Sequence, residues 1–360
     1  MTPPPRRSRR VLHVVNRLNN LGDGIANVCV DLACRQADER DVVAVATVPG
    51  GFTDLVRSHG VRVADVDFRR KSVRGLLTTL IKVRRAVREF DPDIVHAHTL
   101  VATVIARVAT TGMRARVVAT VHNEYQRGVV LMGLAHQVVG VSTAVSEAMA
   151  ARGIPRRKIS TVLNGVVGSP RRVRKAEPVE VPDLIQPAIV AVGAVSHRKG
   201  ADLLVEAARR LAVSDGAHTY LVGNLDWAEL GDEVSASDAA DFIHFVGFDP
   251  QPQRFIKAAT VFVLASRKDP APLSLVEATE AGVAIVAAAV DGVPELLDDG
   301  DAGVLVPADD ADALTAAIGS LLRNPARRAA LAERAHAQSQ RLTVERVSSD
   351  YRDIYDSLLR

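Results

Sequence analysis

The sequence has few of the features that mark secreted or membrane-spanning proteins. Only two of its 360 residues are cysteines, Cys29 and Cys34, which argues against a disulfide framework and favours reduced thiols. No apolar run reaches the roughly 20 residues that a membrane-spanning helix needs. The opening ten residues contain prolines and arginines but no hydrophobic stretch, so they do not resemble a secretory signal. These absences predict a cytoplasmic protein.

The chain also lacks a strong charge of either sign. Its net charge is +3, from 45 basic and 42 acidic residues, and four of the basic residues are arginines in the first ten positions. We therefore expect residues 1–10 to be a disordered basic tail on a nearly neutral folded body. Such a charge balance gives no indication of nucleic-acid binding.

What the sequence does contain is two series of short apolar runs separated by helical stretches. The length suits two domains, and continuous apolar strands alternating with helices indicate parallel sheets covered on both faces. We predict an α/β protein with doubly wound domains at 11–168 and 187–343, a polar linker at 169–186 and an amphipathic helix at 344–360. The expected strands are 11–15, 42–48, 61–66, 94–98, 117–122, 138–142 and 159–163, then 188–193, 219–223, 242–247, 260–266, 284–289 and 304–307.

The stretch from Val261 to Gly282 carries the clearest chemical signal. A hydrophobic strand leads into a proline-containing loop, which opens onto a helix, and Glu277 follows Asp269 by eight residues. Backbone N–H groups at a helix N-terminus suit a diphosphate, and a carboxylate suits sugar hydroxyls. The combination predicts a nucleotide-sugar site, although Glu277 alone would be explained equally by a surface acid favoured by the helix dipole.

A second loop follows the strand that begins at Ala188. Here the sequence AVSHRKG places Lys199 after a strand, where its ammonium group could pair with a phosphate; a polar turn is the alternative. Glycines at the ends of two further strands allow a ligand to approach the backbone. Plain strand-to-helix turns explain these glycines equally well.

Taken together, Asp269-x7-Glu277, Lys199-Gly200 and Asn164-Gly165 resemble the motifs of the family 4 retaining glycosyltransferases. The resemblance implies a GT-B fold, in which two Rossmann-like domains face a central cleft and the closing helix returns to the first domain. It also implies a metal-independent transfer of sugar from a nucleoside diphosphate, UDP or GDP, to a hydroxyl acceptor. The family has Glu where Asp269 stands and Arg where Ala194 stands, so Arg198 or His197 would have to replace that arginine.

The resemblance also assigns residues to roles. The catalytic candidates are His122, Lys199, Asp269 and Glu277. The donor-binding candidates are Gly22, Gly24, His197, Arg198, Gly223, Asn224, Gly247, Phe248, Ala271, Leu273, Ser274 and Glu277, and the acceptor-side candidates are Asp23, Asn27, His98 and Asn123.

Two other site types deserve comparison in the first half. A dinucleotide fingerprint would need a third glycine after Gly22 and Gly24, but Asn27 stands at that position. Asp23 is also a natural helix cap. His96, His98 and His122 could be read as zinc ligands, although a further ligand or water and an ordered second shell would be required.

Residues 69–90 combine eight basic residues with one acid, Glu89, and apolar residues lie between them: Leu76, Leu77, Leu80, Ile81, Val83 and Val87. This segment could dock on an anionic membrane from the cytoplasmic side, or it could pack its apolar stripe on the sheet with its charges in solvent. The acceptor could be a glycolipid, a polysaccharide precursor or a small metabolite. Two alternatives to a transferase remain: a nucleoside diphosphate sugar epimerase, and a nucleotide-sugar-binding protein with little turnover.

Overall fold

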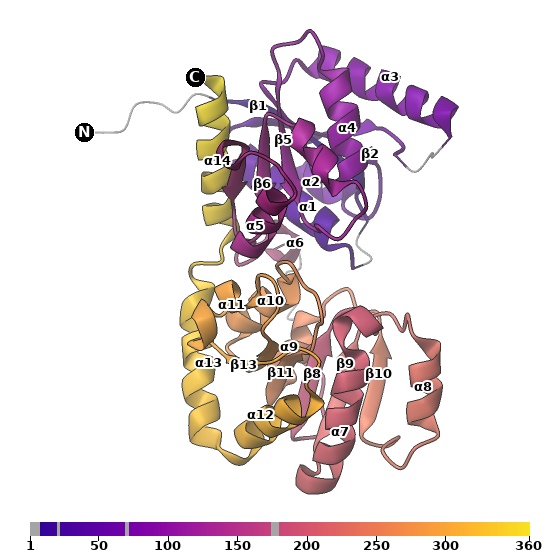
Figure 1. Cartoon of the computed structure of the whole chain (residues 1–360), viewed down its shortest axis with the longest axis vertical. Coiled ribbons are helices and arrows are strands. Elements are labelled where there is room, and N and C mark those ends of the chain that lie inside the picture. Colours follow the sequence, from indigo (N-terminus) through magenta and orange to yellow (C-terminus); the bar gives the residue numbers. More distant parts are fainter. Residues whose placement is uncertain (1–7, 20–21, 69–71, 174–179) are drawn as a thin grey trace, which may run out of the picture. The chain divides into compact units, whose positions relative to one another are not determined.

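The computed structural model describes residues 8–19, 22–68, 72–173 and 180–360, which form two compact units (Figure 1). The first unit comprises the chain up to Asn164, residues 168–174 and residues 344–360. The second comprises residues 165–167 and 175–343. Each unit is built on a parallel sheet, so the predicted α/β fold class is confirmed.

The sheet of the first unit has seven parallel strands in the order β3-β2-β1-β4-β5-β6-β7. Its central strands are continuous apolar runs because helices cover both faces, and β4 and β5, for example, are buried almost throughout. The strands are β1 Arg10–Arg17, β2 Val42–Val48, β3 Arg62–Asp65, β4 Ile94–Ala97, β5 Arg116–Val121, β6 Gln137–Gly140 and β7 Ile159–Thr161.

The helices of the first unit alternate with its strands, as right-handed parallel crossovers require. Serine, threonine or aspartate begins several of them; Asp23, for example, caps α1. They are α1 Gly24–Asp38, α2 Thr53–Ser58, α3 Val73–Phe90, α4 Leu100–Ala109, α5 Thr143–Ala151, α6 Pro170–Val173 and α14 Val344–Leu359, with 3₁₀ turns η1 Val129–Leu134 and η2 Arg156–Lys158.

The sheet of the second unit has six parallel strands in the order β10-β9-β8-β11-β12-β13. They are β8 Ala188–Val192, β9 His218–Val222, β10 Ile243–Gly247, β11 Val261–Leu264, β12 Ala284–Ala288 and β13 Val304–Val306. The helices are α7 Ala201–Asp215, α8 Ala228–Ser235, α9 Gln253–Ala258, α10 Leu273–Ala281, α11 Val293–Leu296, α12 Ala311–Arg323 and α13 Pro325–Ser339, with η3 His197–Lys199 and η4 Asp298–Gly300. Reversal of strand order beside β8 and β11 creates the topological switch point at which doubly wound sheets bind ligands.

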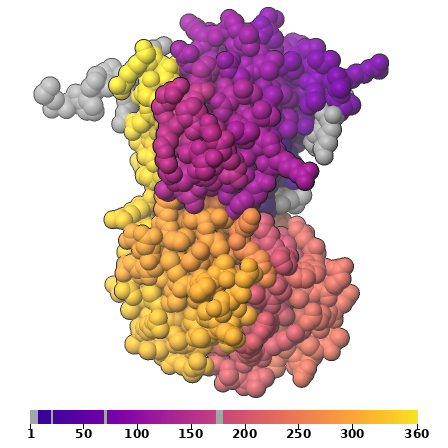
Figure 2. All heavy atoms as spheres, in the orientation of Figure 1, coloured from indigo at the N-terminus to yellow at the C-terminus, as the bar shows by residue number. Residues whose placement is uncertain are grey.

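Helix α14 completes the core of the first unit although residues 162–343 separate it from β7. Tyr351 and Tyr355 are 2% and 0% exposed and pack against Val11, Ile94 and Val118 of the sheet. Figure 2 shows α14, in yellow, on the outside of this unit. Two buried aromatic rings of this size stabilise the contact by several kcal/mol, since a buried aromatic side chain contributes roughly 1.5 to 3 kcal/mol.

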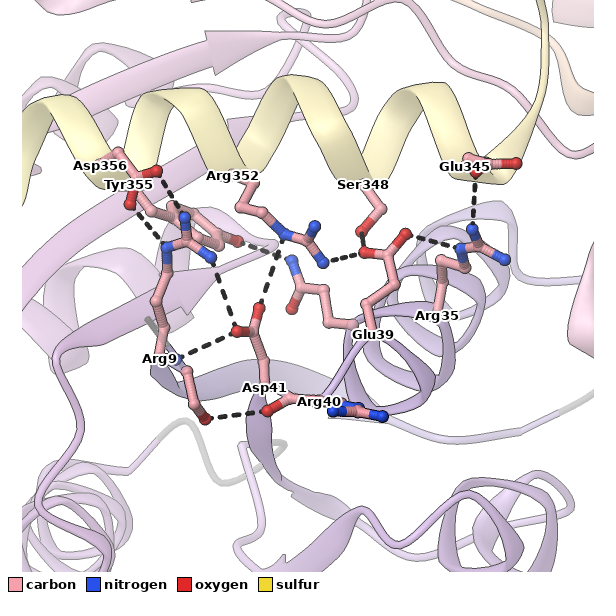
Figure 3. A network of polar contacts seen from close by, with 12 residues as sticks. Arg9, Arg35, Glu39, Arg40, Asp41, Glu345, Ser348, Arg352, Tyr355 and Asp356 are labelled. Carbon is pink, nitrogen blue, oxygen red and sulfur yellow. Dashed lines mark hydrogen bonds and ion pairs between the residues drawn. The ribbon is translucent and has the colours of Figure 1, made fainter. Parts of the chain in front are cut away.

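A row of ion pairs fixes the polar edge of α14 (Figure 3). Arg352 contacts Glu39 and Asp41, which lie between α1 and β2, and Ser348 donates to Glu39 at 2.8 Å. Arg9 Nε donates to Asp356 at 2.8 Å, and the Arg9 guanidinium lies 3.6 Å from Asp41. Burial raises the pKa of Asp41 although both arginines oppose the change. Removing one partner from such a buried group would leave an uncompensated charge.

The expected basic tail ends earlier than position 10. Residues 1–7 lie outside the described residues, but Arg9 is 5% exposed and Arg10 begins β1. The expectation of disorder is therefore wrong for these two arginines. Its error was to treat all the early arginines alike, whereas Asp41 and Asp356 compensate Arg9, and Asp93 accepts a hydrogen bond from the Arg10 N–H.

Residues 169–186, expected to form the linker, begin with a folded segment. The short helix α6 lies against α1, where Arg171 makes two 2.9 Å hydrogen bonds to Asp31 and Ser169 donates to the same carboxylate at 2.6 Å. The sequence did not predict this folded segment, because charged side chains make its contacts and its composition is therefore as polar as that of a linker. Residues 174–179 lie outside the described part.

Two expectations from composition can be compared directly with the structure. Cys29 and Cys34 are buried free thiols, and burial raises the pKa of Cys34 to about 12. The helices within the described residues include none that is long and apolar enough to cross a bilayer.

Candidate active site

Lys199 and Asp269 meet at the carboxyl ends of two adjacent strands in the second unit. Lys199 follows β8, Asp269 follows β11, and these strands pair directly. Lys199 Nζ lies 2.6 Å from Asp269 Oδ2, and the side chains are 19% and 8% exposed. The sequence predicted both residues at a ligand site; the structure brings them together as an ion pair.

Two neighbours hold the Asp269 carboxylate and its backbone in place. Ser266 Oγ donates to Asp269 Oδ2 at 3.0 Å, and the Asp269 N–H donates to Asp291 Oδ2 at 2.6 Å. Asp291 follows β12, the next strand of the sheet. Neither Ser266 nor Asp291 was among the predicted site residues, although both stand directly after strands, where the topology places ligand contacts.

Helix α10 begins beside this ion pair and lacks a side-chain cap. Its N-cap residue is Pro272, which has no side-chain hydrogen-bonding group, so no side chain of that residue satisfies the first amides of Leu273 and Ser274. Amides of this kind, with the helix dipole behind them, favour an anion. Ala271 precedes them and is buried, and Glu277 lies in the second turn and is half-buried.

A clamp built on Arg267 joins the two loops that carry Lys199 and Asp269. Arg267 donates to both oxygens of Asp202 at 2.7 Å, and it donates to the His197 carbonyl oxygen at 2.7 Å. Burial would raise the pKa of Asp202, but the hydrogen bonds from Arg267 outweigh burial and the pKa is lowered. Sequence reasoning missed Arg267; its position three residues after β11 was the available signal.

Arg198 and His197, the expected substitutes for the family arginine at Ala194, are both exposed. Arg198 Nη1 donates to the Lys268 carbonyl oxygen at 3.0 Å, and the His197 ring lies 5.8 Å from the Trp227 ring. Both are therefore on the rim of the loop pair. A small pocket beside them is lined by Gly193, Ala194, Lys199 and Ser266, among others.

Gly223 follows β9 and Gly247 ends β10, and both have a positive φ that favours glycine, +157° and +82°. A Cβ on Gly223 would lie 2.0 Å from the carbonyl oxygen of Gly193, so only glycine fits there. The backbone carbonyl oxygen of Asn224 accepts a hydrogen bond from the Val195 N–H, and Asn224 is exposed. Gly247 and Phe248 do not line the pocket beside Lys199. Their predicted contact with the nucleotide base stays a prediction.

Around the start of α1 lie two predicted donor-side residues, Gly22 and Gly24, and two predicted acceptor-side residues, Asp23 and Asn27. Asp23 accepts from the Ile25 and Ala26 N–H groups at 3.1 and 3.3 Å, so it is the N-cap. Gly22 has a φ of +72°, Gly24 is the first residue of α1, and Asn27 is half-buried in its first turn.

His122 lies at the end of β5 and is half-buried, whereas His98, expected on the acceptor side, is 1% exposed. His98 Nδ1 is 3.3 Å from His122 Nε2, so the buried His98 ring is hydrogen-bonded to the half-buried His122 ring. Asn123 accepts from the Tyr125 N–H at 2.9 Å and so forms a local turn.

The zinc interpretation of His96, His98 and His122 does not fit these contacts. His96 Nδ1 is 2.7 Å from the Tyr355 hydroxyl and His96 Nε2 is 2.6 Å from Thr120 Oγ1, so both ring nitrogens have partners. Among the described residues, His13, Cys29 and His98 instead form a group whose possible ligand atoms lie within 4.8 Å of one another. His13 and His98 are already hydrogen-bonded to each other at 3.0 Å.

Known proteins resemble both halves of the chain. Residues 22–167 match the model of the Glycosyltransferase Family 4, and residues 174–338 match that of the Glycosyl transferases group 1. The phosphatidyl-myo-inositol mannosyltransferase of Mycolicibacterium smegmatis is 27% identical over 77% of this chain and 74% of its own length. The amylovoran biosynthesis glycosyltransferase AmsK of Erwinia amylovora is 29% identical over 46% of this chain, and the match spans only 42% of AmsK.

Solved structures agree on the fold. Anabaena HepE in complex with UDP and glucose has a TM-score of 0.82 at 22% identity, with 97% of this chain and 100% of HepE covered. WaaG, a glycosyltransferase involved in lipopolysaccharide biosynthesis, has a TM-score of 0.75 at 15% identity, with 96% and 99% covered. Because the two family models together cover most of the sequence and the fold agrees, this chain belongs to the family 4 glycosyltransferases and has the GT-B fold.

Proposed function

We propose that this protein transfers a sugar from a nucleoside diphosphate sugar, with UDP or GDP as the nucleotide, to a hydroxyl acceptor, with retention at the anomeric carbon. The observation that carries the proposal is the Lys199–Asp269 pair beside the uncapped start of α10. A cation, a carboxylate and helix amides at one sheet edge suit the phosphate and sugar parts of one donor. The HepE complexes with UDP and with UDP-glucose support a donor of this class.

In this proposal the reaction needs no metal ion. The bond between the anomeric carbon and the diphosphate oxygen breaks as the acceptor oxygen bonds to the same face of that carbon. The acceptor proton passes to an oxygen of the leaving diphosphate. Lys199 exchanges Asp269 for the diphosphate and stabilises its developing charge, together with the amides of Leu273 and Ser274. Asp269 is then available to sugar hydroxyls, and Glu277 to those of the ribose.

A thermal-shift screen with UDP-, GDP-, ADP- and dTDP-sugars tests the donor class. A donor present at 100 times its dissociation constant should stabilise the protein by about 2.7 kcal/mol. Release of nucleoside diphosphate only when a hydroxyl acceptor is added would identify a transferase. Conversion of the donor sugar without any acceptor would indicate an epimerase instead, and binding without turnover would indicate a binding protein.

We further propose that α3 docks the protein on an anionic membrane. The hydroxyl acceptor would then be a lipid-linked molecule in that membrane. Val83, Val87 and Phe90 are buried, but Val73, Leu77 and Ile81 are 75%, 53% and 67% exposed. These three are spaced four residues apart and therefore share one helix face. Exposed basic residues surround them: Arg74, Lys82, Arg85 and Arg88. Residues 69–71 of the predicted basic segment lie outside the described residues.

Two other elements of the first unit also carry exposed apolar side chains. Helix α4 packs against α3, and η1 packs against α4 (Figure 1). Both neighbours add half-exposed apolar side chains to the surface: Val101, Val108, Val130, Leu131 and Leu134. The sequence offered membrane docking and packing on the sheet as alternatives. In the structure α3 packs on the unit with one face and leaves a second apolar face in solvent.

Liposome flotation tests the docking surface. We expect Leu77→Glu combined with Ile81→Glu to lower recovery with anionic vesicles at least tenfold, because each basic residue near such a surface contributes only about 1 kcal/mol and the inserted apolar side chains supply the rest. Val213→Glu is the matched control, since Val213 is 90% exposed on α7 of the second unit. Equal recovery with neutral and anionic vesicles would contradict the proposal.

A further inference from the structure

Three histidines of the first unit form a hydrogen-bonded chain that ends at His122. His13 lies within β1, His98 follows β4 and His122 follows β5, and these strands are neighbours in the sheet. His13 Nδ1 is 3.0 Å from His98 Nε2, and His98 Nδ1 is 3.3 Å from His122 Nε2. His98 therefore makes one hydrogen bond with each ring nitrogen, through Nε2 to His13 and through Nδ1 to His122.

The other end of this chain is an amide. His13 Nε2 is 2.9 Å from Gln36 Oε1 of α1, and Gln36 Nε2 donates to the Tyr355 hydroxyl of α14 at 3.4 Å. The Tyr355 hydroxyl is in turn 2.7 Å from His96 Nδ1. Gln36 is 1% exposed, so the protein alone supplies its partners.

The amide gives the chain a direction. An amide oxygen only accepts hydrogen bonds, so His13 Nε2 must carry the proton. A neutral imidazole has one N–H, which makes His13 Nδ1 the acceptor and His98 Nε2 the donor. By the same reasoning His98 Nδ1 accepts and His122 Nε2 donates. The proton on His122 is thus fixed on Nε2 by a residue three hydrogen bonds away.

These proton positions require that all three rings are neutral. Burial lowers the pKa of His13 and of His122 to about 4. Burial, with repulsion from His96, His13 and His122, lowers the pKa of His98 well below its usual value. At neutral pH each ring therefore carries one N–H. Within the described residues, His122 Nδ1 has no hydrogen-bond partner.

We infer that Gln36, His13 and His98 are positioning residues that hold His122 as its Nε2–H tautomer, which leaves Nδ1 as a hydrogen-bond acceptor. The arrangement resembles the second shell that orients a metal-binding or catalytic histidine. With the other tautomer, Nδ1 would donate instead and could not accept a hydroxyl proton in a hydrogen bond. The consequence for turnover rests on the proposed function, but the tautomer does not.

Nitrogen NMR on the full chain labelled with ¹⁵N-histidine reads the tautomer without substrate. At neutral pH we expect His122, His98 and His13 to show the pattern of the Nε2–H form. His136 is an internal reference, because it is not one of the hydrogen-bonded histidines. Its Nδ1 accepts a hydrogen bond from the Val117 N–H at 2.8 Å. Finding His122 as the Nδ1–H tautomer would overturn the inference and leave the transferase proposal intact.

Two substitutions at Gln36 separate positioning from packing. Gln36→Met removes the acceptor at similar volume, and we expect the His122 signals to shift to a mixture of tautomers. Gln36→Glu restores an acceptor for His13 Nε2–H, so the Nε2–H pattern should return. In a donor-consumption assay, kcat/KM should fall roughly tenfold in Gln36→Met, which is the usual effect of losing one hydrogen bond. It should recover in Gln36→Glu.

Signals of His122 that stay unchanged in folded Gln36→Met would overturn the inference. Equal loss of kcat/KM in both variants, with both tautomer patterns unchanged, would do the same, because it would assign Gln36 a role in packing only. The His136 signals should remain constant throughout and so report that the first unit is folded.

Discussion

Replacing Lys199 by methionine should lower kcat/KM for sugar transfer by about 10²- to 10³-fold, the usual cost of removing one group that stabilises developing charge. Lys199 is the ammonium at the centre of the site, 2.6 Å from Asp269, and its loss would leave the departing diphosphate without that charge. Steady-state kinetics with saturating acceptor would measure the effect.

The same substitution leaves the buried Asp269 carboxylate without its cation. We therefore expect a fall in stability as well, and the double variant Lys199→Met, Asp269→Asn should recover stability but not activity. Lys257→Met is the control, because Lys257 is an exposed lysine on α9 of the same unit. Activity of Lys199→Met within threefold of the unaltered protein would contradict the proposed role.

The first unit should lose about 4 kcal/mol of its free energy of unfolding between about pH 8 and pH 5. The folded pKa of His13 and of His122 is lowered to about 4 from 6.5. Their contribution is complete above pH 6.5, and it is lost as the pH falls toward 4, because the unfolded chain takes up protons first. His96 and His98 act in the same direction, whereas the raised pKa of Asp41 acts against them.

Urea unfolding at several pH values measures this loss, and the chain contains its own comparison. Trp227, the single tryptophan, lies in the second unit and reports that unit by fluorescence. Circular dichroism in the tyrosine region reports chiefly the first unit, which holds Tyr125, Tyr351 and Tyr355. The tyrosine transition should move with pH much more than the tryptophan transition. A first unit that is equally stable at both pH values would show that the buried histidines keep ordinary pKa values.

The fold could be predicted because the sequence alternates short apolar runs with helical stretches. Runs such as Val261–Leu264 are apolar throughout, as strands covered on both faces must be. The order of the strands within each sheet comes from the structure. The positions of Lys199 and Asp269 followed from the same logic, because both stand after strands. The boundary errors at Arg9 and Arg171 have one cause: buried ion pairs leave no period in the sequence.

The partners of side chains could not be predicted in the same way. That Lys199 pairs with Asp269, and that Arg267 clamps Asp202, depends on which loops the sheet brings together. His13 did leave a signal, as the lone polar residue in the apolar run VLHVV at residues 11–15. A buried polar group needs a hydrogen-bond partner, but the sequence alone does not identify Gln36 or His98 as that partner.

The return of α14 to the first unit has a consequence for synthesis of the protein. When β7 has left the ribosome, Ile94 and Val118 still lack the tyrosines that cover them. About 180 residues intervene before α14, which is a delay of roughly 10 to 35 s at ordinary elongation rates. The nascent first unit must spend that interval with an open hydrophobic face, while the second unit is free to fold, so the part made first is the part finished last.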